Sequence, residues 1–310
     1  MTIKNVLICG IGAIGSIYAV KLLENKKCNL KILVDETRLE RYKQNGLDFN
    51  DKKYDFDYTL PQNADNFKAD LIIIAVKNSG LKWVIENIKN FLTKDTIIMS
   101  LLNGITSEDE ILEEYNNAKV LYSYFVGHTS TRLGRKITFD GVGNIIFGTL
   151  NDKFKKEVED VENFFKENNI TFEIPKDINY ARFCKYMMNI GLNQTSALSG
   201  ASYKIFQQKG ANYHLMLKLF EEVSLLAKAM GVKNYQNLIS DALKYLDLMI
   251  PEGKSSMLQD ILNGSKTEVE IFSKTIIDLG KKYNINVPYN QVVYDAICAL
   301  EENINKSQKN

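Results

Sequence analysis

The chain carries the sequence VLICGIGAIG at residues 6–15, in which four apolar residues lead into three closely spaced glycines. A buried strand that feeds a glycine-rich turn and then a helix presents backbone N–H groups to an anion, and this arrangement cradles a pyrophosphate. The first glycine permits the tight turn, the second lets the backbone approach the phosphates, and the third lets the helix pack closely. The predicted dinucleotide-binding residues of the turn are Gly10, Ile11, Gly12, Ala13, Ile14 and Gly15.

The residues that follow this turn strengthen the interpretation. A helix is predicted over residues 16–25 and a strand over residues 30–34, which ends at Asp35, twenty positions after Gly15. A carboxylate at that point accepts hydrogen bonds from the adenosine ribose hydroxyls of a dinucleotide. Glycine-rich patterns also occur in ordinary tight turns between a strand and a helix, so the pattern alone is weak. The flanking strand, helix and carboxylate favour a dinucleotide site.

The composition is that of an ordinary globular protein. The 310 residues are enough for two domains, 25% of them are charged, 45% are hydrophobic, and the net charge is +1. A near-neutral chain gives no reason to expect nucleic acid as a partner. The chain has no uninterrupted apolar run of about eighteen residues, and its apolar N-terminal stretch lacks a cleavage site, so we expect neither a membrane partner nor a signal peptide.

The residue types for metal or nucleophilic chemistry are scarce. The four cysteines stand apart without CxxC spacing, and the chain has two histidines, His128 and His214. A zinc site and a Ser–His triad need more than this, so no metal is expected. Scattered cysteines are typical of reduced thiols, which predicts a cytoplasmic location.

Strand and helix signals alternate through the first half of the chain, which predicts a doubly wound, mostly parallel sheet. We therefore expect an α/β Rossmann domain over residues 1–175. Ligands of such sheets bind at the carboxyl ends of the strands, where Asp35, Lys77 and Asn103 fall, although strand ends are often polar in any protein. Strands are predicted at residues 69–76, 96–102, 119–126, 136–139, 144–147 and 171–174, and helices at residues 36–45, 81–91 and 153–168.

The second half has helical periodicity and few strand signals. This pattern predicts an all-α C-terminal domain over residues 176–310. The predicted helices cover residues 182–196, 212–230, 236–249, 257–262, 266–283 and 289–303.

One of these predicted helices carries an unusual polar stripe. Lys185, Asn189 and Asn193 are spaced i, i+4 and i+8 among mostly apolar neighbours, so on a regular helix they share one face. A lysine with two amides in such surroundings is typical of a face turned toward a ligand. A solvated helix face with a lysine that reaches into water is the alternative.

A second polar cluster runs from Ser255 to Glu268. Ser256 with Gln259, and Ser265 with Glu268, both fit the capping box of a helix. A helix cap is a sufficient reason for these residue types, and from the residues alone it is the preferred interpretation.

These motifs together resemble the ketopantoate reductase (2-dehydropantoate 2-reductase) family over nearly the whole chain. The resemblance rests on the glycine turn, Val76-Lys77, Asn103-Gly104, the Lys185/Asn189/Asn193 stripe, Ser256-Met257-Leu258-Gln259-Asp260 and Thr267-Glu268. It implies a Rossmann domain followed by a helical domain, with the active site in the cleft between them. It also implies reduction of a 2-oxo acid by hydride from NADH or NADPH, with 2-dehydropantoate converted to D-pantoate in pantothenate biosynthesis.

The resemblance also implies roles for single residues. Lys185 resembles the family's general acid, and Glu268 resembles its partner beside the cofactor and the substrate. Asn103 would lie between the nicotinamide and the substrate. The implied substrate-binding residues are Asn103, Lys185, Asn189, Asn193 and Ser256, and the implied cofactor-binding residues beyond the glycine turn are Asp35, Lys77, Asn103, Ser130 and Glu268. His128, without a carboxylate partner in view, is interpreted as structural.

Three positions depart from the family pattern. Asp35 stands where an arginine usually pairs with the 2′-phosphate of NADPH, which favours NADH by about tenfold to a hundredfold, although Arg38 could offset part of this. Gly253 and Tyr203 stand at or near positions where members carry asparagines that bind the substrate.

These departures keep two alternatives open. The first is an NAD-dependent D-2-hydroxy acid dehydrogenase of the same family that acts on another 2-oxo acid. The second is a non-catalytic dinucleotide-sensing regulatory protein, which would not need the lysine stripe or Glu268. The expected partner is a small-molecule 2-oxo acid, and a homodimer through the helical domain is a further expectation.

Overall fold

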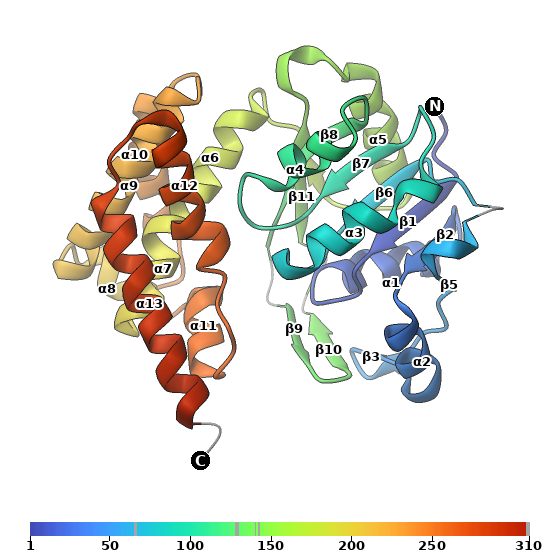
Figure 1. The fold of residues 1–310 in the computed structure, drawn as a ribbon, viewed down its shortest axis with the longest axis horizontal. Coiled ribbons are helices and arrows are strands. Elements are labelled where there is room, and N and C mark those ends of the chain that lie inside the picture. The colour runs from blue at the N-terminus through green and yellow to red at the C-terminus, as the bar shows by residue number, and fades with distance from the viewer. Residues whose placement is uncertain (65–66, 128–129, 140, 142, 308–310) are drawn as a thin grey trace. The chain divides into compact units, whose positions relative to one another are not determined.

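The computed structural model describes residues 1–64, 67–127, 130–139, 141 and 143–307. The chain divides into two compact units, Met1–Ile178 and Asn179–Asn310, each of which is visible in Figure 1. The first unit is α/β and the second is helical. The predicted domain boundary after residue 175 falls three residues before the observed division.

An eight-stranded sheet forms the centre of the N-terminal unit, in the order β12-β11-β8-β7-β6-β1-β2-β5. The strands from β5 to β8 are parallel, and β11 runs antiparallel to β8. Because β1 pairs with β2 on one side and β6 on the other, the strand order reverses between β1 and β6. The strands are β1 (Asn5–Cys9), β2 (Asn29–Leu33), β5 (Tyr58–Thr59), β6 (Leu71–Ile74), β7 (Ile97–Ser100), β8 (Lys119–Val126), β11 (Asn144–Gly148) and β12 (Phe172–Glu173).

Helices cover both faces of this sheet. Along β1, Val6 and Ile8 enter one apolar cluster, and Leu7 and Cys9 enter the other, as the two-residue period of a strand requires. The first cluster takes side chains from α1 and α5, and the second from α3 and α4. The helices are α1 (Gly15–Asn25), α2 (Glu36–Asn45), α3 (Leu81–Asn87), α4 (Ser107–Glu114) and α5 (Lys155–Glu167), with short 3₁₀ turns η1 (Pro61–Asn63), η2 (Asn78–Gly80), η3 (Lys89–Phe91) and η4 (Leu150–Asp152).

A second, four-stranded sheet has the order β4-β3-β10-β9. Its strands are β3 (Asp48–Phe49), β4 (Lys52–Lys53), β9 (Ser130–Leu133) and β10 (Lys136–Phe139). The sequence predicts only β10 of these. The strands β3 and β4 have two residues each and therefore carry no periodicity, and the four-residue β9 is missed as well.

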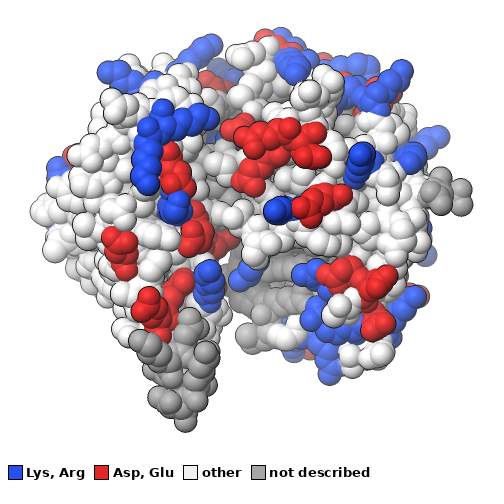
Figure 2. Space-filling view, in the orientation of Figure 1, with Lys and Arg blue, Asp and Glu red and all other residues white. Residues whose placement is uncertain are grey.

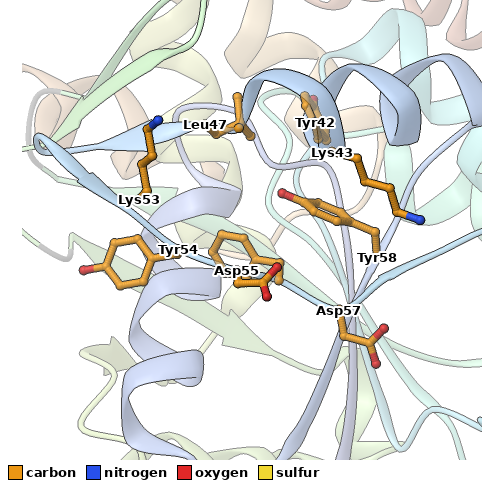
Figure 3. A pocket seen from close by; sticks show the side chains of 10 residues that line it. Tyr42, Lys43, Leu47, Lys53, Tyr54, Asp55, Asp57 and Tyr58 are labelled. Carbon is orange, nitrogen blue, oxygen red and sulfur yellow. The ribbon is translucent and has the colours of Figure 1, made fainter.

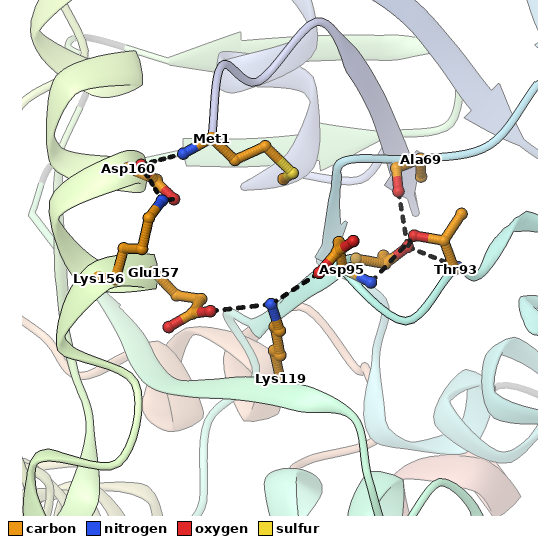
Figure 4. A network of polar contacts seen from close by, with 9 residues as sticks. Met1, Ala69, Thr93, Asp95, Lys119, Lys156, Glu157 and Asp160 are labelled. Atoms are coloured by element: carbon orange, nitrogen blue, oxygen red, sulfur yellow. Dashed lines mark hydrogen bonds and ion pairs between the residues drawn. The ribbon is translucent and has the colours of Figure 1, made fainter.

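Ion pairs tie α5 to the edges of neighbouring elements (Figure 4). Lys119, at the start of β8, bonds Asp95 at 3.0 Å and Glu157 of α5 at 2.9 Å. One turn further along α5, Asp160 bonds both Lys156 and the amino group of Met1. These pairs hold the N-terminus and β8 against α5.

The C-terminal unit consists of helices, and no strand is found in its described part, up to residue 307. Two segments are wider π-turns, η5 (Asn189–Asn193) and η7 (Glu270–Lys274). The helices are α6 (Ile178–Met188), α7 (Gln194–Ser199), α8 (Tyr203–Gln207), α9 (Ala211–Ala229), α10 (Leu238–Asp247), α11 (Ser256–Leu262), α12 (Thr275–Tyr283) and α13 (Pro288–Ser307), with a 3₁₀ turn η6 (Tyr235–Asn237).

Two of the helix predictions for this unit are wrong in part. The predicted helix 182–196 is interrupted by the π-turn η5, and residues 266–269 of the predicted helix 266–283 are not helical. Both segments are held by contacts to residues distant in sequence, which local periodicity does not report.

Among the described residues, none of the helices combines the length and apolar character needed to cross a bilayer. In the same part of the chain, no three His, Cys, Asp or Glu side chains gather as metal ligands. Figure 2 shows acidic and basic side chains interspersed over the face in view.

Candidate functional site

The glycine turn lies where the strand order reverses. Gly10 directly follows β1 with φ +103°, a backbone conformation that favours glycine. The Ala75 N–H, just after β6, donates to the Cys9 carbonyl at 2.8 Å. A Cβ on Gly10 would lie 2.6 Å from the Ala75 oxygen. Residue 10 must therefore be glycine for the ends of β1 and β6 to meet, at the point where such sheets bind ligands.

The rest of the turn fits a pyrophosphate. A Cβ on Gly15 would lie 1.9 Å from the Gly10 carbonyl oxygen, so the start of α1 packs directly on the turn. A Cβ on Gly12, in contrast, would meet no heavy atom within 4 Å, which leaves open space beside this backbone. No side chain caps the N-terminus of α1 at Ile14. An open glycine backbone before an uncapped helix N-terminus is the arrangement that holds a dinucleotide phosphate.

Asp35 lies between β2 and α2 and is already engaged. Its Oδ1 caps α2 by accepting the Arg38 N–H at 2.6 Å, and its Oδ2 bonds the Arg38 guanidinium. The side chains of Asp35 and Arg38 remain 32% and 51% exposed, so both are accessible to a ligand. The negative charge of Asp35 is therefore partly neutralised by Arg38.

Lys77 and Asn103 follow the next two strands of the sheet. Lys77 is exposed after β6, and Asn103 is half-buried after β7. Because β2, β1, β6 and β7 are parallel, Asp35, Gly10, Lys77 and Asn103 follow the same edge of the sheet. The structure therefore brings the glycine turn, Asp35, Lys77 and Asn103 to one edge of the sheet, but not Ser130, which lies in the small sheet.

A buried carboxylate that sequence reasoning missed anchors the segment after Asn103. Glu108 is 2% exposed and accepts bonds from the Ser123 N–H at 3.2 Å and the Ser107 hydroxyl at 3.1 Å. The hydroxyl of Ser100, at the end of β7, donates to Ser107 at 2.8 Å. This network ties the two ends of the Asn103 loop together.

The predicted residues near position 130 are only partly described. His128 lies outside the described residues. Ser130 begins β9 of the small sheet, where its backbone pairs with Phe139.

Lys185 and Glu268 both belong to the C-terminal unit. Lys185 lies on α6 and Glu268 lies two residues before η7, and both are half-buried. Burial lowers the pKa of Lys185 to about 8, while the charge of Glu268 acts in the opposite direction. The carboxylate is therefore close enough to act on the ammonium. A lysine with this pKa is mostly protonated at neutral pH, yet it is a stronger acid than an ordinary lysine.

The two asparagines of the stripe meet on the π-turn η5. Asn193 Nδ2 donates to Asn189 Oδ1 at 2.9 Å. Asn189 is only 7% exposed, and its Nδ2 has no hydrogen-bond partner among the described residues. A buried N–H without a partner costs about 1–3 kcal/mol, which a bound carboxylate or hydroxyl oxygen would offset. The stripe predicted on a regular helix is thus a π-turn that leaves one buried donor for a ligand.

The capping predictions for the second cluster are wrong. Ser255, not Ser256, caps α11: it is buried, and its hydroxyl accepts the Leu258 N–H at 3.1 Å. The Ser255 hydroxyl also donates to the Asn193 carbonyl at 3.4 Å, so the start of α11 lies against η5. Ser256 is exposed in the first turn of α11. Ser265 and Glu268 cap no helix, since η7 has Val269 at its N-cap without a side-chain bond.

Tyr203 and Gly253, two of the positions that depart from the family pattern, contact each other. The Tyr203 N–H donates to the Gly253 carbonyl at 3.1 Å. A Cβ on Gly253 would lie 2.8 Å from the Tyr203 ring. The aromatic ring therefore occupies the space that a side chain at position 253 would need.

A cavity of about 560 Å³ opens elsewhere in the N-terminal unit, beside the end of α2 (Figure 3). It is lined by aromatic and charged side chains, among them Tyr42, Tyr58, Lys43 and Asp57. None of its described lining residues belongs to the predicted site.

Two family models match the chain. The model described as ketopantoate reductase PanE/ApbA matches residues 6–152, and the model of the ketopantoate reductase PanE/ApbA C terminal matches residues 177–301. The 2-dehydropantoate 2-reductase of Aquifex aeolicus (strain VF5) is 25% identical over 301 residues, which cover 95% of this chain and 96% of the relative.

Two solved structures have a similar fold. D-mandelate dehydrogenase, in a ternary complex with NADH and anilino(oxo)acetate, has a TM-score of 0.82 at 21% identity, with 97% of this chain and 100% of that chain covered. A ketopantoate reductase from Staphylococcus aureus, described as dimeric, has a TM-score of 0.73 at 19% identity, with 97% and 99% covered.

Proposed function

Since the chain belongs to the ketopantoate reductase family, we propose that it reduces 2-dehydropantoate to D-pantoate with Lys185 as the proton donor. The chain is an NAD(P)-dependent oxidoreductase of this family. A purely sensing role, one of the alternatives from the sequence, is not retained.

The reduction places a hydride on the carbonyl carbon and a proton on the carbonyl oxygen. The bound nicotinamide supplies the hydride. Lys185 is assigned to the transfer of the proton to the carbonyl oxygen. Its lowered pKa of about 8 suits a group that must hold a proton at neutral pH and then release it. The negative charge of Glu268 favours the ammonium form and so helps to keep Lys185 protonated before the transfer. In this proposal Lys185 and Glu268 are the catalytic residues.

The observation that carries the proposal is the buried Asn189 amide beside this acid on the same helical run. Its oxygen is engaged by Asn193, so the orientation of the amide is fixed and its Nδ2 is available to an oxygen of the substrate. We assign the substrate carboxylate or hydroxyl to Asn189, Asn193 and Ser256. Asn103 of the other unit is assigned to the nicotinamide and the substrate.

A second candidate is a D-2-hydroxy acid dehydrogenase that acts on another 2-oxo acid with NADH. The contact of Tyr203 with Gly253 favours it, because the ring fills the space of a side chain at 253, where the resemblance implies a substrate-binding asparagine in some members. The similarity to the fold of D-mandelate dehydrogenase is consistent with this candidate.

Steady-state rates with a substrate panel separate the two candidates. We expect kcat/KM for 2-dehydropantoate to exceed that for phenylpyruvate by about tenfold or more. A higher kcat/KM for the aromatic acid would reject 2-dehydropantoate and favour the second candidate. No oxidation of NADH or NADPH with any 2-oxo acid would reject both.

The cofactor preference depends on Asp35. A carboxylate repels the 2′-phosphate of NADPH, but Arg38 neutralises part of this charge, so we expect the wild-type Kd for NADH to be about tenfold lower than that for NADPH. Asp35→Asn keeps an N-cap acceptor and removes the charge, and it is expected to bring the two Kd values close together. Fluorescence titration of both variants measures this. Equal or tighter binding of NADPH by the wild type would contradict the assignment.

The same family resemblance leads us to infer a homodimer. All four cysteines are free, which is consistent with the expected cytoplasmic location.

A further inference from the structure

The segment that carries Glu268 has no regular structure of its own. Residues 265–268 belong to neither a helix nor a strand. The Ser265 N–H donates to the Asp260 carbonyl at 2.8 Å, and the Glu268 carbonyl accepts the Ile271 N–H at 3.1 Å. Without a helical ladder, the direction of the Glu268 side chain depends on what holds the backbone between these two bonds.

Thr267 is the residue held there, and its partner is Glu301 of α13. The Thr267 N–H and the Thr267 hydroxyl both donate to Glu301 Oε1, at 2.7 Å and 2.5 Å. The Thr267 hydroxyl oxygen accepts the Val269 N–H at 3.3 Å. Thr267 is only 6% exposed, so water competes little for these bonds. Bonds to a carboxylate are about twice as strong as those between neutral groups.

A second contact from α13 reaches the same region. The Tyr294 hydroxyl donates to Glu270 Oε1 at 3.1 Å. Tyr294 and Glu301 are seven residues apart and therefore lie on one face of α13. This face of α13 runs along residues 267–270. The carboxylate of Glu301 is therefore held by a long helix and not by a loop.

We propose that Glu301 is a positioning residue: by holding the backbone and hydroxyl of Thr267, it directs the neighbouring Glu268 toward Lys185. This role rests on the proposed function, in which Lys185 donates the proton. Glu301 itself is not assigned a contact with substrate or cofactor.

The consequence for Lys185 follows from the charge of Glu268. That charge raises the pKa of Lys185 against the effect of burial. If residue 268 loses its direction, the pKa of Lys185 falls further. The other titratable groups beside Glu301 on this face are Tyr294 and Cys298 of α13 and Glu270 of η7, and the variants compared below leave all three unchanged. Asp295 is the fourth such group, and it is replaced only in the control variant.

The test compares Glu301→Ala with Glu301→Gln. Alanine removes the acceptor but favours the helix, whereas glutamine keeps Oε1 as an acceptor and removes the charge. We expect Glu301→Ala to lower kcat by roughly tenfold to a hundredfold with little change in the KM for the cofactor. We also expect the titration of Lys185 to move to lower pH by about half a pH unit or more, while Glu301→Gln stays close to the wild type in both.

The titration is read without substrate, by NMR of protein labelled with ¹³Cε-lysine, and Lys185→Arg identifies the signal. Asp295→Ala is the matched control, because it removes an exposed acidic side chain of α13 that bonds Gln291 on the same helix. If the wild type reduces no 2-oxo acid, the proposed function fails, but the Lys185 titration still decides the role of Glu301.

Three results would overturn the proposal: an unchanged Lys185 titration in Glu301→Ala, an equal effect of Glu301→Gln, or an equal effect of Asp295→Ala. Should Glu301→Ala fail to fold, Thr267→Val takes its place, since it removes the hydroxyl bond from the other side. Thr267→Ser then serves as the conservative variant. A Lys185 titration in Thr267→Val that matches Thr267→Ser would also reject the role.

Discussion

Replacing Lys185 by alanine is expected to lower kcat for reduction of a 2-oxo acid by roughly 10²–10⁴-fold, the usual contribution of a positioned general acid. The nearby amides of Asn189 and Asn193 carry no acidic proton for the developing alkoxide, so they do not replace it. Binding of the cofactor should change little, because Lys185 is not among its predicted contacts and all of these except Glu268 are in the N-terminal unit. Stopped-flow oxidation of NADH measures the rate, and fluorescence titration measures the binding.

The pH dependence gives this prediction a second measurement. Lys185 donates only when protonated, so the wild-type kcat/KM should fall as the pH rises through about 8, the pKa to which burial lowers this group. The variant should lose that limb of the profile. Lys218→Ala is the control, since Lys218 is an exposed lysine paired with Glu221 at 2.9 Å, and its rate should stay within about twofold of wild type. A Lys185→Ala rate within tenfold of wild type would exclude the proton-donor role.

Replacing Gly12 by alanine is expected to raise the Kd for NADH by about 10²-fold while the fold stays intact. The added methyl group meets no protein atom within 4 Å, so the melting temperature should change little. The methyl group instead enters the space through which the turn approaches the pyrophosphate, at a cost of about one charge-assisted hydrogen bond. Thermal melts and NADH titration measure the two effects separately.

Alanine substitutions at two other glycines serve as comparisons for Gly12→Ala. Gly15→Ala would place a Cβ 1.9 Å from the Gly10 oxygen, so it should lower both stability and binding. Gly210→Ala, also a change into open space, should leave binding unchanged and lower stability only by the cost of alanine at the N-cap of α9. Wild-type affinity for NADH in Gly12→Ala would show that the cofactor does not approach this turn.

The longer elements could be predicted from the sequence because their signals are local. The helix Glu36–Asn45 was predicted with both ends correct, since Asp35 provides the cap and Gly46 ends it. The buried parallel strand β6 is apolar throughout, β7 is apolar up to Ser100, and polar turns mark the ends of both. The π-turns η5 and η7 could not be predicted, because their widening depends on tertiary contacts such as the Ser273 N–H to Gln194 bond of 3.2 Å.

The difference between local signals and tertiary contacts also explains which residues of the candidate site could not be predicted from the sequence. The resemblance pointed to both Lys185 and Glu268, and the charge of Glu268 raises the pKa of Lys185 against the effect of burial. The cap at Ser255 carries no capping-box signal, because the residue three positions on is Leu258, whereas its neighbour Ser256 fits the spacing with Gln259. Glu108 lies in an acidic run that is typical of an exposed helix start, and only its bond to the Ser123 N–H reveals its burial. Glu301 lies 34 residues from its partner, a distance over which no local pattern connects two residues.

The Tyr203–Gly253 contact limits the order in which substitutions can accumulate during evolution. Any side chain introduced at 253 would strike the aromatic ring and would also lie 3.0 Å from the Ile250 carbonyl oxygen. A lineage that gains an amide at 253 must first shrink or relocate the residue at 203. The two positions are therefore expected to change as a coupled pair, with a smaller residue at 203 accommodating a larger one at 253.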